Sequence, residues 1–317
     1  MYTGIDILLY LQDYRLSAPE IIDSFFHLIS HPFLTGLFPV LMMAVIYWCY
    51  DKRAGTYLAF NIFAIHICTH FLKLLLYVPR PWILEPAIHP TTEAISGAGG
   101  FSCPSGHTTA AVAFFGSLAV LFRKPLVLPA LCLITMLSIG FSRMYLGVHT
   151  PLDVFLGLIL SGCMLWINWH LLIYMDRNPQ KDRLVVLGIM VMLLLLIAGV
   201  FLRSYPEIAG VGPNVVANSF VSFFLPIGWF CGFLLGWLIE RRKIHFTIPH
   251  GILPRGIRSL LGLILLLGLQ AGFGVCLPPL LGTDVGMFVS CFLFGLFVSA
   301  GYPWIFQFIL GKTRFPL

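Results

Sequence analysis

Residues 184–202 read LVVLGIMVMLLLLIAGVFL, an unbroken run of 19 residues without a charged or polar side chain. A helix of about 20 residues crosses the hydrocarbon core of a bilayer, so this run predicts a membrane-spanning helix. Similar runs recur along the 317 residues, of which 59% are hydrophobic and only 10% charged. Soluble domains carry about 25% charged residues, and the runs lack the alternation of barrel strands. The fold class is therefore predicted to be all-α, a polytopic membrane helix bundle.

The hydropathy pattern predicts about nine transmembrane helices. Helices satisfy every backbone group within the segment, as the bilayer interior requires. Residues 1–32 contain no run of spanning length, and the segments 5–11 and 21–29 mix apolar and polar residues, as helices lying at the membrane interface do. The predicted spans are 33–50, 55–77, 106–122, 126–145, 151–175, 184–202, 218–239, 257–277 and 285–309.

Basic residues set the predicted orientation, because Lys and Arg in short loops stay on the cytoplasmic side. Fourteen of the 19 Lys and Arg residues share one side, which places the C-terminus in the cytoplasm and the N-terminus outside. Their scatter over several loops excludes a nucleic-acid-binding patch despite the net charge of +6. The fourteen are Lys52, Arg53, Arg123, Lys124, Arg177, Lys181, Arg183, Arg241, Arg242, Lys243, Arg255, Arg258, Lys312 and Arg314.

The longest polar stretch is the loop 78–105, VPRPWILEPAIHPTTEAISGAGGFSCPS, on the predicted outer side. Long loops on a rigid scaffold often carry function. The loop holds Cys103, whereas the other seven cysteines lie in apolar runs, and the eight show neither a CxxC pair nor metal-ligand spacing. No disulfide is therefore predicted. The start of the chain lacks a basic n-region, so no cleavable signal peptide is expected.

Three cations cluster at the outer ends of the predicted spans. Lys73 lies within the last two turns of the second span, and Arg80 follows where prolines stop the helix. Arg143 lies at the end of the fourth span. A lysine at membrane depth is costly unless it lines a cavity or meets an anion. The alternative role for all three is anchoring at the interface by snorkelling. Anchors of this kind require no fixed spacing to other residues.

A helix start lies on the same side. Ser105 is a good N-cap for the third span, and Gly106 lets a ligand approach the backbone. Free N–H groups at such a helix start attract anions. Together with the three cations, this start predicts a cradle for a phosphoryl group, whose charge in transfer spreads over its equatorial oxygens.

Two histidines bracket the predicted cradle. His149 and Asp153 are four residues apart at the start of the fifth span, so the carboxylate can orient the imidazole and keep its far nitrogen nucleophilic. His107 is placed to act as a general acid on the leaving oxygen. The alternative roles are hydrogen-bonded interior histidines and, for Asp153, a structural acid at a helix N-terminus.

Three spacings resemble the type 2 phosphatidic acid phosphatase superfamily. They are KxxxxxxRP (Lys73–Pro81), PSGH (Pro104–His107) and SRxxxxxHxxxD (Ser142–Asp153), in the order and at the separations of that family, and the resemblance covers about residues 55–175. The joint match is far more specific than any one of the strings. The resemblance implies a membrane phosphatase that needs no metal and no cofactor.

The resemblance also implies a role for each residue of the motifs. His149 would attack phosphorus and form a phosphohistidine, Asp153 would orient it, and His107 would protonate the leaving group. The phosphoryl oxygens would be held by Lys73, Arg80, Ser105, Gly106 and Arg143.

The chain is predicted to divide into an N-terminal interfacial segment, 1–32, a catalytic bundle, 33–183, with the active-site loop 78–105, and further spans at 184–317. Small bacterial members of the family look like six-helix bundles. The glucose-6-phosphatase branch looks like nine helices with an outside N-terminus. The spans after residue 183 contain no family motif, and their role is left open.

The predicted function is metal-independent hydrolysis of a lipid phosphate or diphosphate at the non-cytoplasmic face, in a bacterial plasma membrane rather than an endoplasmic reticulum membrane. Candidate substrates are phosphatidic acid, phosphatidylglycerol phosphate, an isoprenyl diphosphate and a sphingoid phosphate. The motifs equally fit a lipid phosphotransferase. A different class, a lipid transporter or binding protein, fits the spans but needs no nucleophile. The pattern leaves the oligomeric state open.

For some other polar residues the sequence indicates a functional role less clearly. His66 and His70 lie four apart near Lys73, where a metal pair would lack a third ligand, so hydrogen bonding inside the bundle is favoured. Arg203 is interpreted as an interfacial anchor rather than a substrate ligand. His89 and Glu93 are candidates for the border of the entrance.

Overall fold

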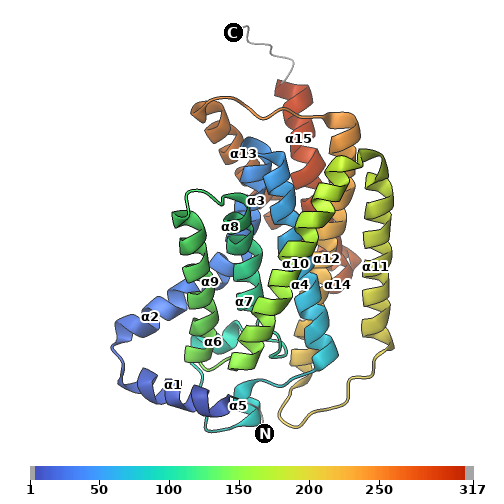
Figure 1. Ribbon diagram of the computed structural model, residues 1–317. Coiled ribbons are helices and arrows are strands. Elements are labelled where there is room, and N and C mark those ends of the chain that lie inside the picture. The colour runs from blue at the N-terminus through green and yellow to red at the C-terminus, as the bar shows by residue number, and fades with distance from the viewer. Residues whose placement is uncertain (1–3, 311–317) are drawn as a thin grey trace. The chain divides into compact units, whose positions relative to one another are not determined.

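The computed structural model describes residues 4–310, and the side chains of residues 4–308. Eight helical segments among these residues are long and apolar enough to cross a membrane, and none of the described residues is in a β-strand. The third predicted span, 106–122, corresponds to a shorter apolar helix, Gly106–Leu121. The prediction of an all-α polytopic bundle is confirmed (Figure 1). Lys312 and Arg314 lie outside the described residues.

The predicted boundaries are close to the observed ones, with two differences at helix starts. The seventh span begins at Pro213, five residues earlier than predicted, because proline suits the first helical turn. The eighth begins at Ile252, after Gly251 with a φ of 87°. The helices are α1 Ile5–Ser17, α2 Glu20–Ile29, α3 Phe38–Cys49, α4 Lys52–Leu76, α5 Pro81–Leu84, α6 Thr92–Ser96, α7 Gly106–Ala111, α8 Ser117–Leu121, α9 Val127–Tyr145, α10 Pro151–Arg177, α11 Asp182–Leu202, α12 Pro213–Ile239, α13 Ile252–Leu281, α14 Thr283–Leu296 and α15 Tyr302–Ile305.

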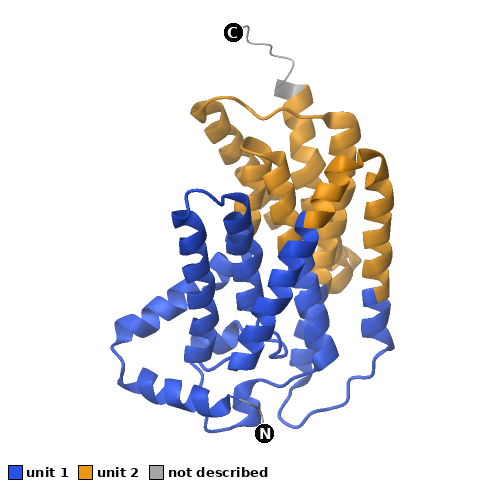
Figure 2. Cartoon of the chain, in the orientation of Figure 1, with its two compact units in different colours: residues 1–39, 64–169, 196–223 blue, residues 40–63, 170–195, 224–317 orange. Residues whose placement is uncertain are grey.

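The chain forms two compact units, shown in different colours in Figure 2. Unit 1 takes in residues up to Pro39, Ala64–Trp169 and Leu196–Phe223. Unit 2 takes in Val40–Phe63, His170–Leu195 and the residues from Phe224 onward. Every residue predicted for the site lies in unit 1. The sequence-based division at residues 32 and 183 stays a prediction.

Close packing in unit 1 fixes the start of α7 against the start of α10. A Cβ atom at Gly157 of α10 would lie 3.3 Å from the carbonyl oxygen of Ser105, a tight contact that glycine avoids. The Ser105 N–H donates to the carbonyl of Asp153 at 2.9 Å. A Cβ at Gly140 of α9 would lie 3.0 Å from Val154 Cγ1. The beginnings of α7 and α10, which carry two of the predicted motifs, therefore lie side by side.

The predicted loop 78–105 is ordered by contacts at its two sides. The N–H of Ser102 donates to the carbonyl of Val78 at 2.9 Å, which closes the loop at its base. Buried Arg15 of α1 donates from Nη2 to the carbonyl of His89 at 2.5 Å and from Nη1 to the carbonyl of Tyr145 at 3.3 Å. Helix α1, predicted as an interfacial segment, thereby supports the loop and the end of α9.

Unit 2 is held by close helix contacts and by a buried ion pair. A Cβ at Gly228 of α12 would lie 2.7 Å from the carbonyl oxygen of Phe288 in α14, a contact typical of membrane helices with small residues between them. Lys52 Nζ lies 2.6 Å from Oε1 of Glu240, whose residue is 3% exposed. The same Nζ lies 3.9 Å from the centre of the Phe246 ring.

Replacing Glu240 by glutamine is expected to lower the stability of the protein in detergent by about 1–3 kcal/mol, because Lys52 would keep its charge without a carboxylate partner. Thermal unfolding of the purified protein measures this change. The double variant Glu240→Gln/Lys52→Met, which removes both charges, should recover part of the loss. A double-mutant coupling near zero would contradict a stabilising role for the pair.

Candidate active site

The turn between α9 and α10 places His149. Backbone N–H groups of Val148 and His149 donate to the carbonyl of Arg143 at 3.0 and 3.2 Å, which closes the turn. Gly147 has a φ of 76°, a conformation that favours glycine, and a Cβ there would lie 3.3 Å from Pro90 Cα. The imidazole of His149 is consequently held at the entry of α10 with 1% of the residue exposed.

One edge of the His149 ring faces Asp153. Nδ1 lies 3.4 Å from Asp153 Oδ2, as the four-residue spacing predicts. The same oxygen accepts hydrogen bonds from Ser102 Oγ at 2.6 Å and from the Thr150 N–H at 2.8 Å. These donors fix the carboxylate behind the ring. Ser102 could not be identified from the sequence, because its position relative to the motifs does not distinguish it from the other polar residues of the loop.

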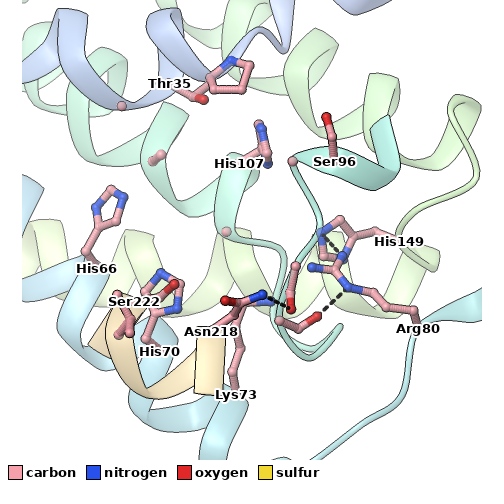
Figure 3. Close-up of a pocket in the computed structure, with 18 residues that line it drawn as sticks. Thr35, His66, His70, Lys73, Arg80, Ser96, His107, His149, Asn218 and Ser222 are labelled. Atoms are coloured by element: carbon pink, nitrogen blue, oxygen red, sulfur yellow. Dashed lines mark hydrogen bonds between the residues drawn. The ribbon is translucent and has the colours of Figure 1, made fainter. Parts of the chain in front are cut away.

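The opposite edge of the ring faces Arg80. Arg80 Nη1 lies 2.9 Å from His149 Nε2 and also donates to the carbonyl of Val148 at 3.0 Å, while its Nε donates to the carbonyl of Gly100 at 2.7 Å (Figure 3). A guanidinium can only donate, so Nε2 is the acceptor nitrogen. The partners thus assign the proton of the neutral ring to Nδ1, on the side of Asp153, and the lone pair to Nε2.

Lys73 is buried and reaches the loop from α4. Its Nζ donates to the carbonyls of Phe101 and Ser102 at 2.5 and 2.8 Å. Carbonyl dipoles stabilise the ammonium at a depth where a bare charge would be costly. Because Lys73 also lines the cavity described below, its charge faces both the loop and the cavity.

The residues of the PSGH segment have different structural roles. Ser105 Oγ accepts from the Thr108 N–H at 3.4 Å and from Thr108 Oγ1 at 2.9 Å, so the predicted N-cap is confirmed. Ser105 is fully buried, whereas Gly106 and His107 line the cavity. Ser105 would therefore act on a ligand only indirectly, by stabilising the helix start.

Arg143 faces a neighbouring cavity of about 450 Å³, which it lines together with His107 and Glu93. The residue is 3% exposed, and Nη1 donates to Ser30 Oγ at 3.1 Å. Its Nε and Nη2 atoms are buried without a hydrogen-bond partner among the described residues. Unpaired donors of a buried cation are unfavourable, so this guanidinium is ready to bind an anion.

One cavity of unit 1, which we term the main cavity because it contains the nucleophile, has a volume of about 490 Å³ and brings five of the predicted residues together (Figure 3). Lys73, Arg80, Gly106, His107 and His149 line it, with Asp153 behind the ring, and no Asp or Glu is among the lining residues. His107 lines both cavities. The lining residues also include polar side chains further along the cavity, namely Thr35, His66, His70, Asn218 and Ser222.

Comparison with known families matches this arrangement. Residues 54–177 match the family described as PAP2 superfamily, and residues 224–313 match the one described as PAP2 superfamily phosphatase, transmembrane extension. The chain contains a PAP2 superfamily domain and the transmembrane extension of PAP2 phosphatases. It is a multi-pass membrane protein, with the motif residues inside the PAP2 match and the second match within unit 2.

Curated relatives of the PAP2 domain are similar over part of the chain. Undecaprenyl-diphosphatase BcrC of Bacillus subtilis is 34% identical over 30% of this chain and 46% of its own length. Lipid A 4'-phosphatase of Bacteroides thetaiotaomicron is 30% identical over 38% of this chain and 54% of its own length. The chain thus spans about half the length of these two relatives. A probable sphingosine-1-phosphate phosphatase of Dictyostelium discoideum is 26% identical over 82% of this chain and 68% of its own length. No solved structure matches.

The residues with weaker sequence signals lie at different places relative to the PAP2 site. His66 and His70 line the main cavity, and no group of three or more possible metal ligands occurs among the described residues. Arg203 donates to the carbonyl of Leu75 and is not among the lining residues. Glu93 lines the neighbouring cavity, whereas exposed His89 lines neither cavity.

The pH dependence of the PAP2 site should follow the neutral form of His149. Burial, and next the charge of Arg80, hold the pKa of His149 well below its ordinary value of 6.5. The acid limb of the kcat/KM profile should therefore lie below pH 6.5, and replacing Arg80 by glutamine should move it to higher pH while the rate falls. Profiles of both proteins with one substrate measure the shift, because the titration of the substrate is common to both. An unmoved limb would contradict the assignment.

Proposed function

We propose that this protein is a phosphatase that hydrolyses a lipid phosphate or diphosphate through a phosphohistidine at His149. The observation that carries the proposal is the position of the buried imidazole, with Asp153 at Nδ1 and the Nε2 lone pair toward a cavity lined by cations. An activated nucleophile needs this pairing with an orienting acid. The names of the relatives support the reaction class, because each describes a phosphatase or diphosphatase.

In the first step, His149 Nε2 attacks phosphorus, and the bond between phosphorus and the lipid oxygen breaks. His107, at the wall between the two cavities, donates a proton to the leaving oxygen. Asp153 stabilises the cationic ring. The entering phosphoryl group takes the place of the contact between Arg80 and Nε2, and this guanidinium then binds a phosphoryl oxygen.

The remaining oxygens are held by Lys73, by the N–H groups at the start of α7 near Gly106, and by the unpaired donors of Arg143. Ser105 contributes by capping this helix start. In the second step, water attacks the phosphohistidine and gives its proton to His107, which releases inorganic phosphate and restores both histidines.

We further propose that the site faces the non-cytoplasmic side of a bacterial plasma membrane. Arg123 and Lys124 precede α9, and His149 follows it, so the basic loop and the nucleophile lie at opposite ends of this helix. Basic loops remain in the cytoplasm. The bacterial origin of the two diphosphatase and lipid A phosphatase relatives supports the choice of membrane.

Phosphate release by the purified full-length protein, in detergent with EDTA present, tests the proposal across phosphatidic acid, phosphatidylglycerol phosphate, a sphingoid phosphate and isoprenyl phosphates. Release from at least one of them, lost on replacing His149, is the expected result. Release that requires a divalent cation would contradict the metal-independent mechanism. Transfer of labelled phosphate to an added lipid alcohol would instead identify a phosphotransferase, and lipid transfer that survives loss of His149 would identify a transporter.

A further inference from the structure

The main cavity extends beyond the cradle along α4. His70 and His66 precede Lys73 by three and seven residues, so they lie about 4.5 and 10.5 Å deeper along the helix axis at 1.5 Å per residue. Their rings stack with centres 6.2 Å apart. Both line the same cavity as Lys73. A substrate that is held by its phosphate at Lys73 and extends along α4 would meet His70 first and His66 further along its lipid part.

Other elements add polar side chains to the lining of this cavity. Asn218 and Ser222 lie one turn apart on α12, and Thr35 lies in the helical turn Phe33–Leu37 (Figure 3). Together with His66 and His70 these side chains form what we term the polar arm of the cavity. They are hydrogen-bonding groups without a formal negative charge, since no Asp or Glu lines this cavity.

His70 carries an unsatisfied nitrogen. Its Nδ1 is buried and has no hydrogen-bond partner within the described part of the chain, although the residue as a whole is partly exposed at the cavity. Buried polar atoms are nearly always paired, and the cavity that His70 lines is where a partner can enter. A ligand group that donates or accepts a hydrogen bond would satisfy it.

We propose that the polar arm recognises a neutral hydrogen-bonding group, a hydroxyl, ester or amide, within a few bonds of the phosphate ester oxygen of the substrate. The inference rests on the proposed function and narrows its substrate class. Glycerol-based and sphingoid lipid phosphates carry such groups, whereas a polyprenyl phosphate is hydrocarbon from its first carbon. A site built to hydrogen-bond a substrate rejects the analogue that lacks the group, because its own polar atoms are then left unpaired.

The test compares kcat/KM of the full-length protein for phosphatidic acid, sphingosine 1-phosphate and farnesyl phosphate in one detergent. The expected wild-type order puts at least one of the first two above farnesyl phosphate. In His70→Leu, kcat/KM for the favoured lipid should fall by about tenfold or more, while that for farnesyl phosphate changes by less than about threefold. His70→Asn, which keeps a hydrogen-bonding group, should recover part of the loss.

Thr69→Val is the matched control. Thr69 neighbours His70, is fully buried, bonds the carbonyl of Ile65 and is not among the lining residues, so its loss should affect the three substrates equally. Unfolding midpoints of all variants check that they are folded. The lipid whose kcat/KM falls in His70→Leu identifies the glycerol or the sphingoid class.

Two results would overturn the inference and leave the proposed function standing. One is an equal loss for all three lipids in His70→Leu, and the other is a wild-type preference for farnesyl phosphate. If the wild-type protein releases phosphate from none of the lipids, the proposed function itself fails.

Discussion

Replacing His149 by asparagine abolishes phosphate release, by a factor on the order of 10⁴ or more, while leaving the protein folded. Asparagine keeps a donor toward Asp153 but offers no nitrogen lone pair where Nε2 now faces the cavity. Steady-state phosphate release from the best lipid of the panel measures the effect. The loss should appear in kcat, because the cations of the cradle still bind the substrate.

A trapping experiment separates loss of the nucleophile from loss of binding. Wild-type protein mixed with ³²P-labelled substrate and quenched in alkaline denaturant should retain label on the chain, and the His149→Asn variant should retain none. His89→Asn is the matched control, since His89 is exposed and lines neither cavity, and it should behave as wild type. Label retained on the variant would place the phosphoryl intermediate elsewhere.

Replacing His107 by alanine should lower hydrolysis of a lipid phosphate by about 10²–10⁴-fold, the usual contribution of a general acid. The same variant should lose far less of its kcat/KM for p-nitrophenyl phosphate, which reports formation of the phosphoenzyme, because the phenolate departs without a proton. The contrast arises because His107 lines the cavity and has no part in the Asp153–His149–Arg80 chain of contacts.

Values of kcat/KM for the two substrates measure this contrast. Phosphoenzyme should accumulate in His107→Ala during turnover of the aryl substrate, because the second step also needs His107, as a base. An equal loss for both substrates would show that His107 acts by binding or structure rather than by proton transfer.

The predictable part of the site depends on short-range periodicity. His149 and Asp153 meet because residues four apart share one side of a helix, and Ser105 caps because its position precedes an apolar run. The order of the three motifs along the spans likewise predicted that Lys73, Arg80 and His107 would converge, and they line one cavity with His149.

The unpredicted part depends on packing between distant segments. Ser102 reaches Asp153 only because the loop folds back to Val78, and Asn218 and Ser222 enter the cavity because α12 packs beside the loop at Gly99 and Gly100. No local pattern reports contacts between residues 51 positions apart, as Ser102 and Asp153 are, or 119 apart, as Gly99 and Asn218 are.

The spans were predictable because a stretch of about 20 apolar residues has one stable conformation in a bilayer. The loop 78–105 was not, because its short helices α5 and α6 end after one turn or so and obtain their stability from neighbours. The position of the Arg143 side chain was also not predictable from the sequence. Its motif spacing is that of the family, yet its side chain lies in the adjoining cavity with His107.

The glycine contacts between α7, α9 and α10 have a mechanical consequence. Because the carbonyl of Ser105 lies so close to Gly157, the helix starts next to the nucleophile and the proton donor are closely packed, and close packing resists sliding of one helix along the other. Entry of a bulky amphiphile and departure of phosphate must then be accommodated by the segment that bears Arg80 and Gly100, which is tied by individual hydrogen bonds. Turnover would then depend on movement of that segment, with its hydrogen bonds breaking and re-forming, rather than on rearrangement of the helices.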